Sequence, residues 1–120
     1  MKSKEDQLQS ECVRWFRYQY PNIVIFAIPN GGIRNPIEAA KLKATGTLAG
    51  VADLFVMWGG NIPNNATDIY LGLFIEMKVG KNQQTPAQKE FEIKAKESGY
   101  AYHICRSFDE FKTVVEDYLK

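Results

Sequence analysis

The stretch Leu73-Phe-Ile-Glu-Met-Lys-Val79 is an apolar strand sequence that two charged residues interrupt. Side chains alternate between the two faces of a strand, so Glu76 and Lys78 project from one face and Met77 from the other. A charged group inside an apolar strand is costly unless it is paired or binds a metal. The stretch therefore predicts a buried strand that carries either an ion-pair network or a chemical site.

A second apolar stretch, residues 51–58, carries Asp53 and precedes a polar connection over residues 59–68. If the turn is centred near Asn64-Asn65, residues whose numbers add up to about 129 lie opposite each other in an antiparallel pair. Asp53 then faces Glu76. A bulge would shift this register by a residue or two, and simple pairing brings two carboxylates and one ammonium to one face.

The remaining chain alternates helical and strand patterns, and no repeat or linker divides it. The 120 residues are enough for one core, so we expect a single domain over residues 1–120. The order predicts an α/β fold, with a four-stranded sheet flanked by helices. The predicted elements are helices over residues 4–20 and 37–45, from Thr85-Pro86 to Ser98-Gly99 and from Ser107 onward, and strands over 23–28, 51–58, 69–79 and 100–105.

Composition excludes several classes of protein. Two cysteines and one histidine nearly exclude a Cys/His zinc site, which needs four suitable ligands. The thiols are expected to be core residues of a cytosolic protein, and the polar start is unlike a signal peptide. No apolar run is long enough to span a bilayer, so no membrane partner is expected. The net charge of +1 neither favours nor excludes a nucleic-acid partner.

Two adjacent carboxylates repel each other unless a cation lies between them. Oxygen ligands without cysteine or histidine favour Mg²⁺ or Mn²⁺ over zinc. With a metal at Asp53 and Glu76, Lys78 would orient a water or neutralise negative charge on a phosphate. The alternative is a structural ion-pair network of the same three residues, and the short pattern alone leaves both readings open.

Two further polar residues have two readings each. Glu11 lies at the edge of the apolar stripe of the first helix, where it either supplies a third metal ligand or reaches solvent. Gln88 completes a capping box with Thr85, which explains it without any function. Its other reading is a contact to substrate or to the strand that carries Glu76.

A polar loop and a short helix are candidates for phosphate contacts. Consecutive Gly31 and Gly32, after Asn30, allow close backbone approach to a phosphate, which Arg34 would clamp. Lys41 and Lys43 follow on the short helix and would attract a nucleic-acid backbone. An ordinary turn and ordinary solvated lysines are the alternatives.

Together these residues resemble the VRR-NUC (virus-type replication-repair nuclease) family of the PD-(D/E)XK superfamily. The resemblance spans residues 8–118, with one departure at Ala52, where many relatives have proline. The matching pieces, in order, are Glu11, Asn30-Gly-Gly-Ile-Arg34, Ala39-Ala-Lys-Leu-Lys43 with Gly46, Gly50-Val-Ala-Asp53-Leu, Ile75-Glu76-Met-Lys78, Gln88 and Gly99-Tyr100.

The resemblance implies a restriction-endonuclease-like αβββαβ core and a metal-dependent DNA endonuclease. Glu11, Asp53, Glu76 and the Met77 carbonyl would bind Mg²⁺ or Mn²⁺, while Lys78 and Gln88 would assist catalysis. Short relatives are similar to Holliday-junction resolvases. They imply a homodimer that acts on branched DNA, such as a four-way junction or a flap, in the cytoplasm of a bacterial or phage-infected cell. The competing interpretations are a non-catalytic module that binds branched DNA and a protein-interaction domain with structural carboxylates.

Overall fold

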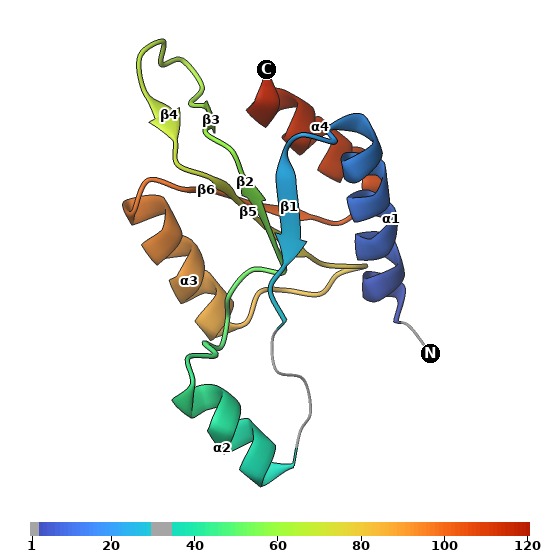
Figure 1. Cartoon of the computed structure of the whole chain (residues 1–120), viewed down its shortest axis with the longest axis vertical. Coiled ribbons are helices and arrows are strands. Elements are labelled where there is room, and N and C mark those ends of the chain that lie inside the picture. Colours follow the sequence, from blue (N-terminus) through green and yellow to red (C-terminus); the bar gives the residue numbers. More distant parts are fainter. Residues whose placement is uncertain (1–2, 30–34) are drawn as a thin grey trace.

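A computed structural model describes residues 3–29 and 35–120. One central sheet lies between two layers of helices (Figure 1). Helices α1 (Lys4–Gln19) and α4 (Phe108–Leu119) cover one face, and α3 (Pro86–Glu97) covers part of the other. Helix α2 (Pro36–Ala44) projects from one end of the molecule. No helix of the described chain is long and apolar enough to cross a membrane.

The sheet has four strands in the order β1-β2-β5-β6, formed by Val24–Ala27, Leu54–Met57, Leu73–Met77 and Ala101–Cys105. Strand β2 is antiparallel to both β1 and β5, whereas β5 and β6 are parallel. The parallel pair is connected through α3, as a crossover connection requires. The predicted α/β class and four-stranded sheet are confirmed, and the sheet is mixed.

The β2–β5 register agrees with the predicted one. Leu54 pairs with Ile75, Phe55 with Phe74 and Val56 with Leu73, so paired residue numbers add up to 129 throughout. Continuing this register by one residue brings Asp53 opposite Glu76.

The predicted continuous strand over residues 69–79 is in fact interrupted. A small second sheet, β3 (Gly60–Asn61) with β4 (Ile69–Tyr70), precedes β5. Gly60 is packed against the Tyr118 ring, and the Tyr118 hydroxyl donates to the Trp58 carbonyl at 2.6 Å. This contact with α4 positions the small sheet away from the direction of the main one.

The two faces of the sheet are packed differently. On the face under α1 and α4 the buried strand residues are aliphatic, as Leu54 and Ile75 are, and they pack with aromatic residues of the helices such as Phe16. The opposite face is a chain of aromatic rings that reaches α3, in which each centroid lies 4.7 to 5.7 Å from the next. Its members are Phe26, Phe55, Phe74 and Phe91.

The position of α3 depends on a close backbone approach at Gly50. Gly50 has a φ of +89°, and a Cβ there would lie 2.4 Å from the Ala87 carbonyl oxygen. Only glycine combines this conformation with this contact. The segment before β2 therefore lies directly against the first turn of α3, next to Gln88.

Candidate active site

Asp53 and Glu76 meet at the end of the β2–β5 pair. The Met77 backbone N–H donates to Asp53 Oδ2 at 2.7 Å, which fixes the Asp53 carboxylate beside the strand that carries Glu76. Glu76 is 2% exposed, and the Asp53 carboxyl lies close enough for its charge to raise the pKa of Glu76. Two acidic groups thus share one poorly solvated position, as the hairpin register predicted.

Burial makes both acids hold their protons more tightly, and for Glu76 the charge of Asp53 adds to this effect. For Glu76, burial and then the charge of Asp53 raise the pKa to about 8. Burial also raises the pKa of Asp53, against the opposing effect of the Met77 N–H. Such a pair is stabilised when a cation replaces the shared proton.

One oxygen of this pair supports the metal interpretation directly. Within the described chain, Glu76 Oε1 is buried and has no hydrogen-bond partner. An unsatisfied buried carboxylate oxygen is costly, because it has lost its water and gained nothing in return. The donor set therefore fits a hard cation at Asp53 and Glu76. Mg²⁺ is commonly held by only one or two carboxylates and keeps several waters.

Lys78 places a positively charged side chain beside the two carboxylates. Its ammonium Nζ lies 3.9 Å from Glu76 Oε2, and the residue is 8% exposed. The positive charge of Lys78 lowers the pKa of both Asp53 and Glu76, but burial outweighs it. A single ammonium thus neutralises part of a two-carboxylate cluster and leaves room for additional positive charge.

Gln88 makes both of the contacts that its two readings predicted. Its Oε1 accepts from the Thr85 N–H at 2.9 Å, and Thr85 Oγ1 accepts from the Gln88 N–H at 3.1 Å, which completes the capping box of α3. Its Nε2 donates to Glu76 Oε2 at 3.1 Å. The cap therefore orients the amide so that its donor end faces the carboxylate.

The first helix presents a second carboxylate, Glu5, that the sequence did not single out beside Glu11. Glu11 is exposed. After burial, the charge of Glu11 is the next cause that raises the pKa of Cys12. Glu5 is partly buried, and after burial the repulsion from Asp53 is the next cause that raises its pKa. Helical spacing from Glu5 to the buried Cys12 places both on the inner face of α1, a signal that points to Glu5.

The acidic residues are close enough to interact but do not yet converge on one point. Among residues 3–29 and 35–120, no group of three or more histidine, cysteine, aspartate or glutamate side chains has a metal-binding arrangement. The predicted three-carboxylate site of Glu11, Asp53 and Glu76 is therefore not assembled in the described chain. Asp53 and Glu76 form its centre, and Glu5 approaches from α1.

No family model and no curated protein matches the sequence. A solved structure described as "VRR_NUC domain protein" superposes with a TM-score of 0.74 at 27% identity, covering 98% of this chain and 89% of that chain. The chain has a VRR-NUC fold. The resemblance predicted from the ordered motifs is confirmed, and VRR-NUC is a PD-(D/E)XK nuclease family.

The predicted DNA contacts of this VRR-NUC fold lie largely beyond what the structure describes. Asn30, Gly31, Gly32 and Arg34 fall outside the described residues. Lys41 and Lys43 are exposed on α2, and a groove of about 620 Å³ lies between that helix and the start of α3. Gln88 and Lys43 both line the groove, so it connects the short helix to the candidate site.

Proposed function

We propose that this chain, a single domain over residues 1–120, is a Mg²⁺- or Mn²⁺-dependent endonuclease that hydrolyses phosphodiester bonds in DNA. The observation that carries the proposal is the buried Asp53–Glu76 pair with an unpartnered oxygen at Glu76 Oε1. A purely structural ion-pair network does not require that oxygen to be left without a partner. The VRR-NUC fold and the nearby Lys78 support the same interpretation.

The residues take separate roles in this proposal. Asp53, Glu76 and the Met77 carbonyl would hold the cation, which would supply Lewis-acid stabilisation of the phosphate. Glu5, on the inner face of α1 and subject to the charge of Asp53, is proposed as the additional ligand, in the role that the resemblance assigns to Glu11.

The proposed catalytic side chains act around that cation. Lys78 orients the attacking water and balances negative charge that develops on the phosphate. Gln88 holds Glu76 in position through Oε2, so that Oε1 would be available to bind the metal. Asn30, Gly31, Gly32, Arg34, Lys41 and Lys43 are proposed to contact the DNA backbone.

A branched DNA substrate and a homodimer complete the proposal, since two linked active sites can cut two strands of a symmetric junction. An apolar patch on the outer face of β1 and β2 offers a surface for the second copy. Val24, Phe26 and Met57 are all at least 40% exposed there, and Val24 pairs directly with Met57. Sedimentation of wild type and Met57→Lys tests this surface. We expect a dimer that the lysine dissociates, and a wild-type monomer would contradict it.

Cleavage of labelled DNA tests the activity. Four-way junction, flap, duplex and single strand are each incubated with Mg²⁺, Mn²⁺ or EDTA. We expect metal-dependent cutting of the branched substrates, lost in Glu76→Gln and kept in Lys94→Gln, a matched change on the outer side of α3. Cutting by Glu76→Gln would overturn the site. Binding of branched DNA without any cutting by wild type would instead favour the non-catalytic binding module.

A further inference from the structure

Helix α1 carries a second stripe of residues beside the face that Cys12 and Phe16 bury in the core. Six residues at helical spacing line one groove of about 640 Å³ along the helix. The stripe changes character along its length, since it starts with an acid and ends with two arginines. Its members are Asp6, Gln9, Ser10, Val13, Arg14 and Arg17.

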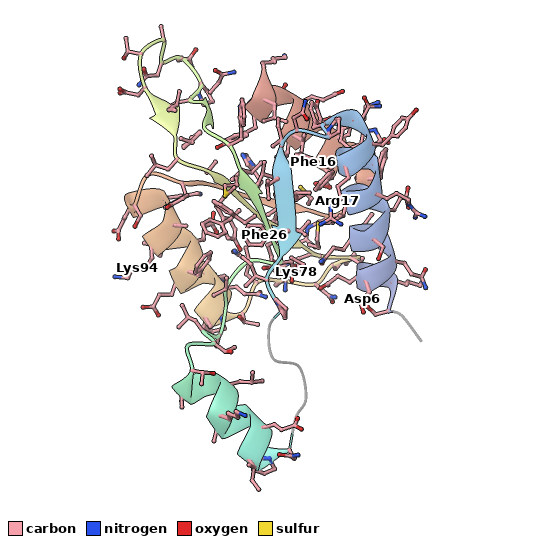
Figure 2. All side chains as sticks on the ribbon, viewed as in Figure 1. Asp6, Phe16, Arg17, Phe26, Lys78 and Lys94 are labelled. Carbon is pink, nitrogen blue, oxygen red and sulfur yellow. The ribbon has the colours of Figure 1, made fainter. Side chains whose placement is uncertain are left out.

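The acidic end of this groove lies at the candidate active site. Asp6 lines the groove, and its charge is one of the causes that raise the pKa of Asp53. Figure 2 shows Asp6 at the N-terminal end of α1, and Lys78 lies near that end. Arg17 lies farther along the helix. The groove therefore leads away from the two carboxylates toward the two guanidinium groups.

The opposite wall of the groove is the free edge of the sheet. The Ile28 N–H donates to the Asp53 carbonyl. In an antiparallel pair every second residue bonds to the neighbouring strand, so the backbone groups of Ile25 and Ala27 point away from β2. Arg17 donates to the Ile25 carbonyl at 3.1 Å, and Ala27 lines the groove. The Ile25 carbonyl, which an added peptide strand would need as an acceptor, is thus already occupied. The same hydrogen bond holds Arg17 in position.

We propose that the α1 groove binds the phosphodiester backbone of the DNA strand that continues from the scissile phosphate, with Arg14 and Arg17 as its phosphate contacts. This inference rests on the proposed nuclease function. Guanidinium groups bind phosphate through paired N–H donors. Asp6 to Arg17 spans about 16 Å of helix, or about five nucleotides at the axial rise of a duplex strand. The groove is thus long enough to guide the strand beyond the cutting position.

Salt-dependent binding tests the proposal. Labelled duplex and four-way junction are titrated with the full chain carrying Glu76→Gln, over a range of KCl concentrations, with and without Arg14→Gln. Removing one phosphate contact weakens binding to all sequences and lowers the slope of log K against log salt by about one. We expect that result for Arg14→Gln, a rescued slope for Arg14→Lys, and no change for Lys94→Gln, whose side chain points away from α1 (Figure 2).

Cleavage by otherwise wild-type protein separates this inference from the proposed function. With Mg²⁺, Arg14→Gln should raise KM several-fold and leave kcat near its wild-type value, since Arg14 lies away from the carboxylates. If wild type cuts DNA while Arg14→Gln binds with the same affinity and the same slope, the groove assignment is wrong and the nuclease assignment stands. If wild type neither cuts nor binds DNA, both are wrong. Strand-like peptide binding at β1 without DNA binding would also overturn the groove proposal.

Discussion

The Gln88 side chain joins the first turn of α3 to Glu76: the amide that completes the helix cap also donates to Glu76 Oε2 at 3.1 Å. A residue that stabilises a helix thus also orients the candidate metal ligand. The two roles can be separated, because Thr85 takes part in only the first.

Comparison of Gln88→Ala with Thr85→Ala separates them. Each variant removes part of the capping box and should lower the free energy of unfolding by about 1 kcal/mol. Only Gln88→Ala releases Glu76, so only that variant should lose about 10- to 100-fold in metal-dependent cleavage. Thermal unfolding and cleavage rates of both variants check this. Equal cleavage losses would mean that Gln88 acts through the helix cap alone.

Glutamine substitution on α1 decides which helical carboxylate serves the site. Glu5 is electrostatically coupled to Asp53, whereas Glu11 is exposed. Glu5→Gln should therefore raise the Mg²⁺ concentration needed for half-maximal cleavage, and Glu11→Gln should leave it unchanged. Metal titrations of both variants test the difference. The reverse pattern would restore Glu11 as the ligand that the motif comparison indicated.

The stability of the metal-free protein should fall as pH rises from about 4.5 to about 8. Glu76 ordinarily has a pKa of 4.5, which folding raises to about 8. Across this window the folded chain holds a proton that the unfolded chain has released, so rising pH favours unfolding. Asp53 shifts in the same direction.

Melting curves at several pH values measure this effect. The Tm of wild type in EDTA should decline through the window and level off above it, and Glu76→Gln should show a smaller decline. Mg²⁺ should raise the Tm most at high pH, where no proton competes with it. A wild-type Tm that rises over the same window would show that the carboxylates are not a protonated pair.

Gly50 should tolerate no side chain. Gly50→Ala would force a Cβ into the Ala87 carbonyl and should destabilise the protein by about 1 to 3 kcal/mol, with reduced cleavage because α3 shifts. Gly46→Ala is the matched control, since Gly46 also has positive φ (+114°) but no neighbour within 4 Å of a Cβ. Denaturant unfolding of both variants separates the backbone cost from the steric one. Equal losses would show that the close approach contributes nothing.

Local sequence patterns predicted much of this fold, because its helices, helix caps and hairpin register are determined by residues close in sequence. Alternation, helix caps and one turn position were sufficient to predict the order of elements and the pairing of Leu54 with Ile75. The β3–β4 sheet was not predicted, since it depends on the contact between Gly60 and Tyr118, which lie far apart along the chain.

The choice between Glu5 and Glu11 on α1 likewise depends on contacts between residues far apart in sequence. Motif order pointed to Glu11, but which side of α1 meets the strands depends on the buried Cys12 and Phe16. Counting helical turns back from these two residues places Glu5 on their side. Tertiary packing therefore adds Glu5 as a candidate ligand beside the Glu11 that the motif indicated.

The pairing of β2 with β5 also has a consequence for the newly made chain. Asp53 leaves the ribosome well before Glu76, and Gln88 later still, so a nascent chain carries unconnected acidic residues with no assembled site. The two carboxylates meet only when β5 has emerged and aligned with β2. If the chain is the nuclease proposed above, its catalytic competence is then a late product of folding, and a copy truncated before β5 would lack the site.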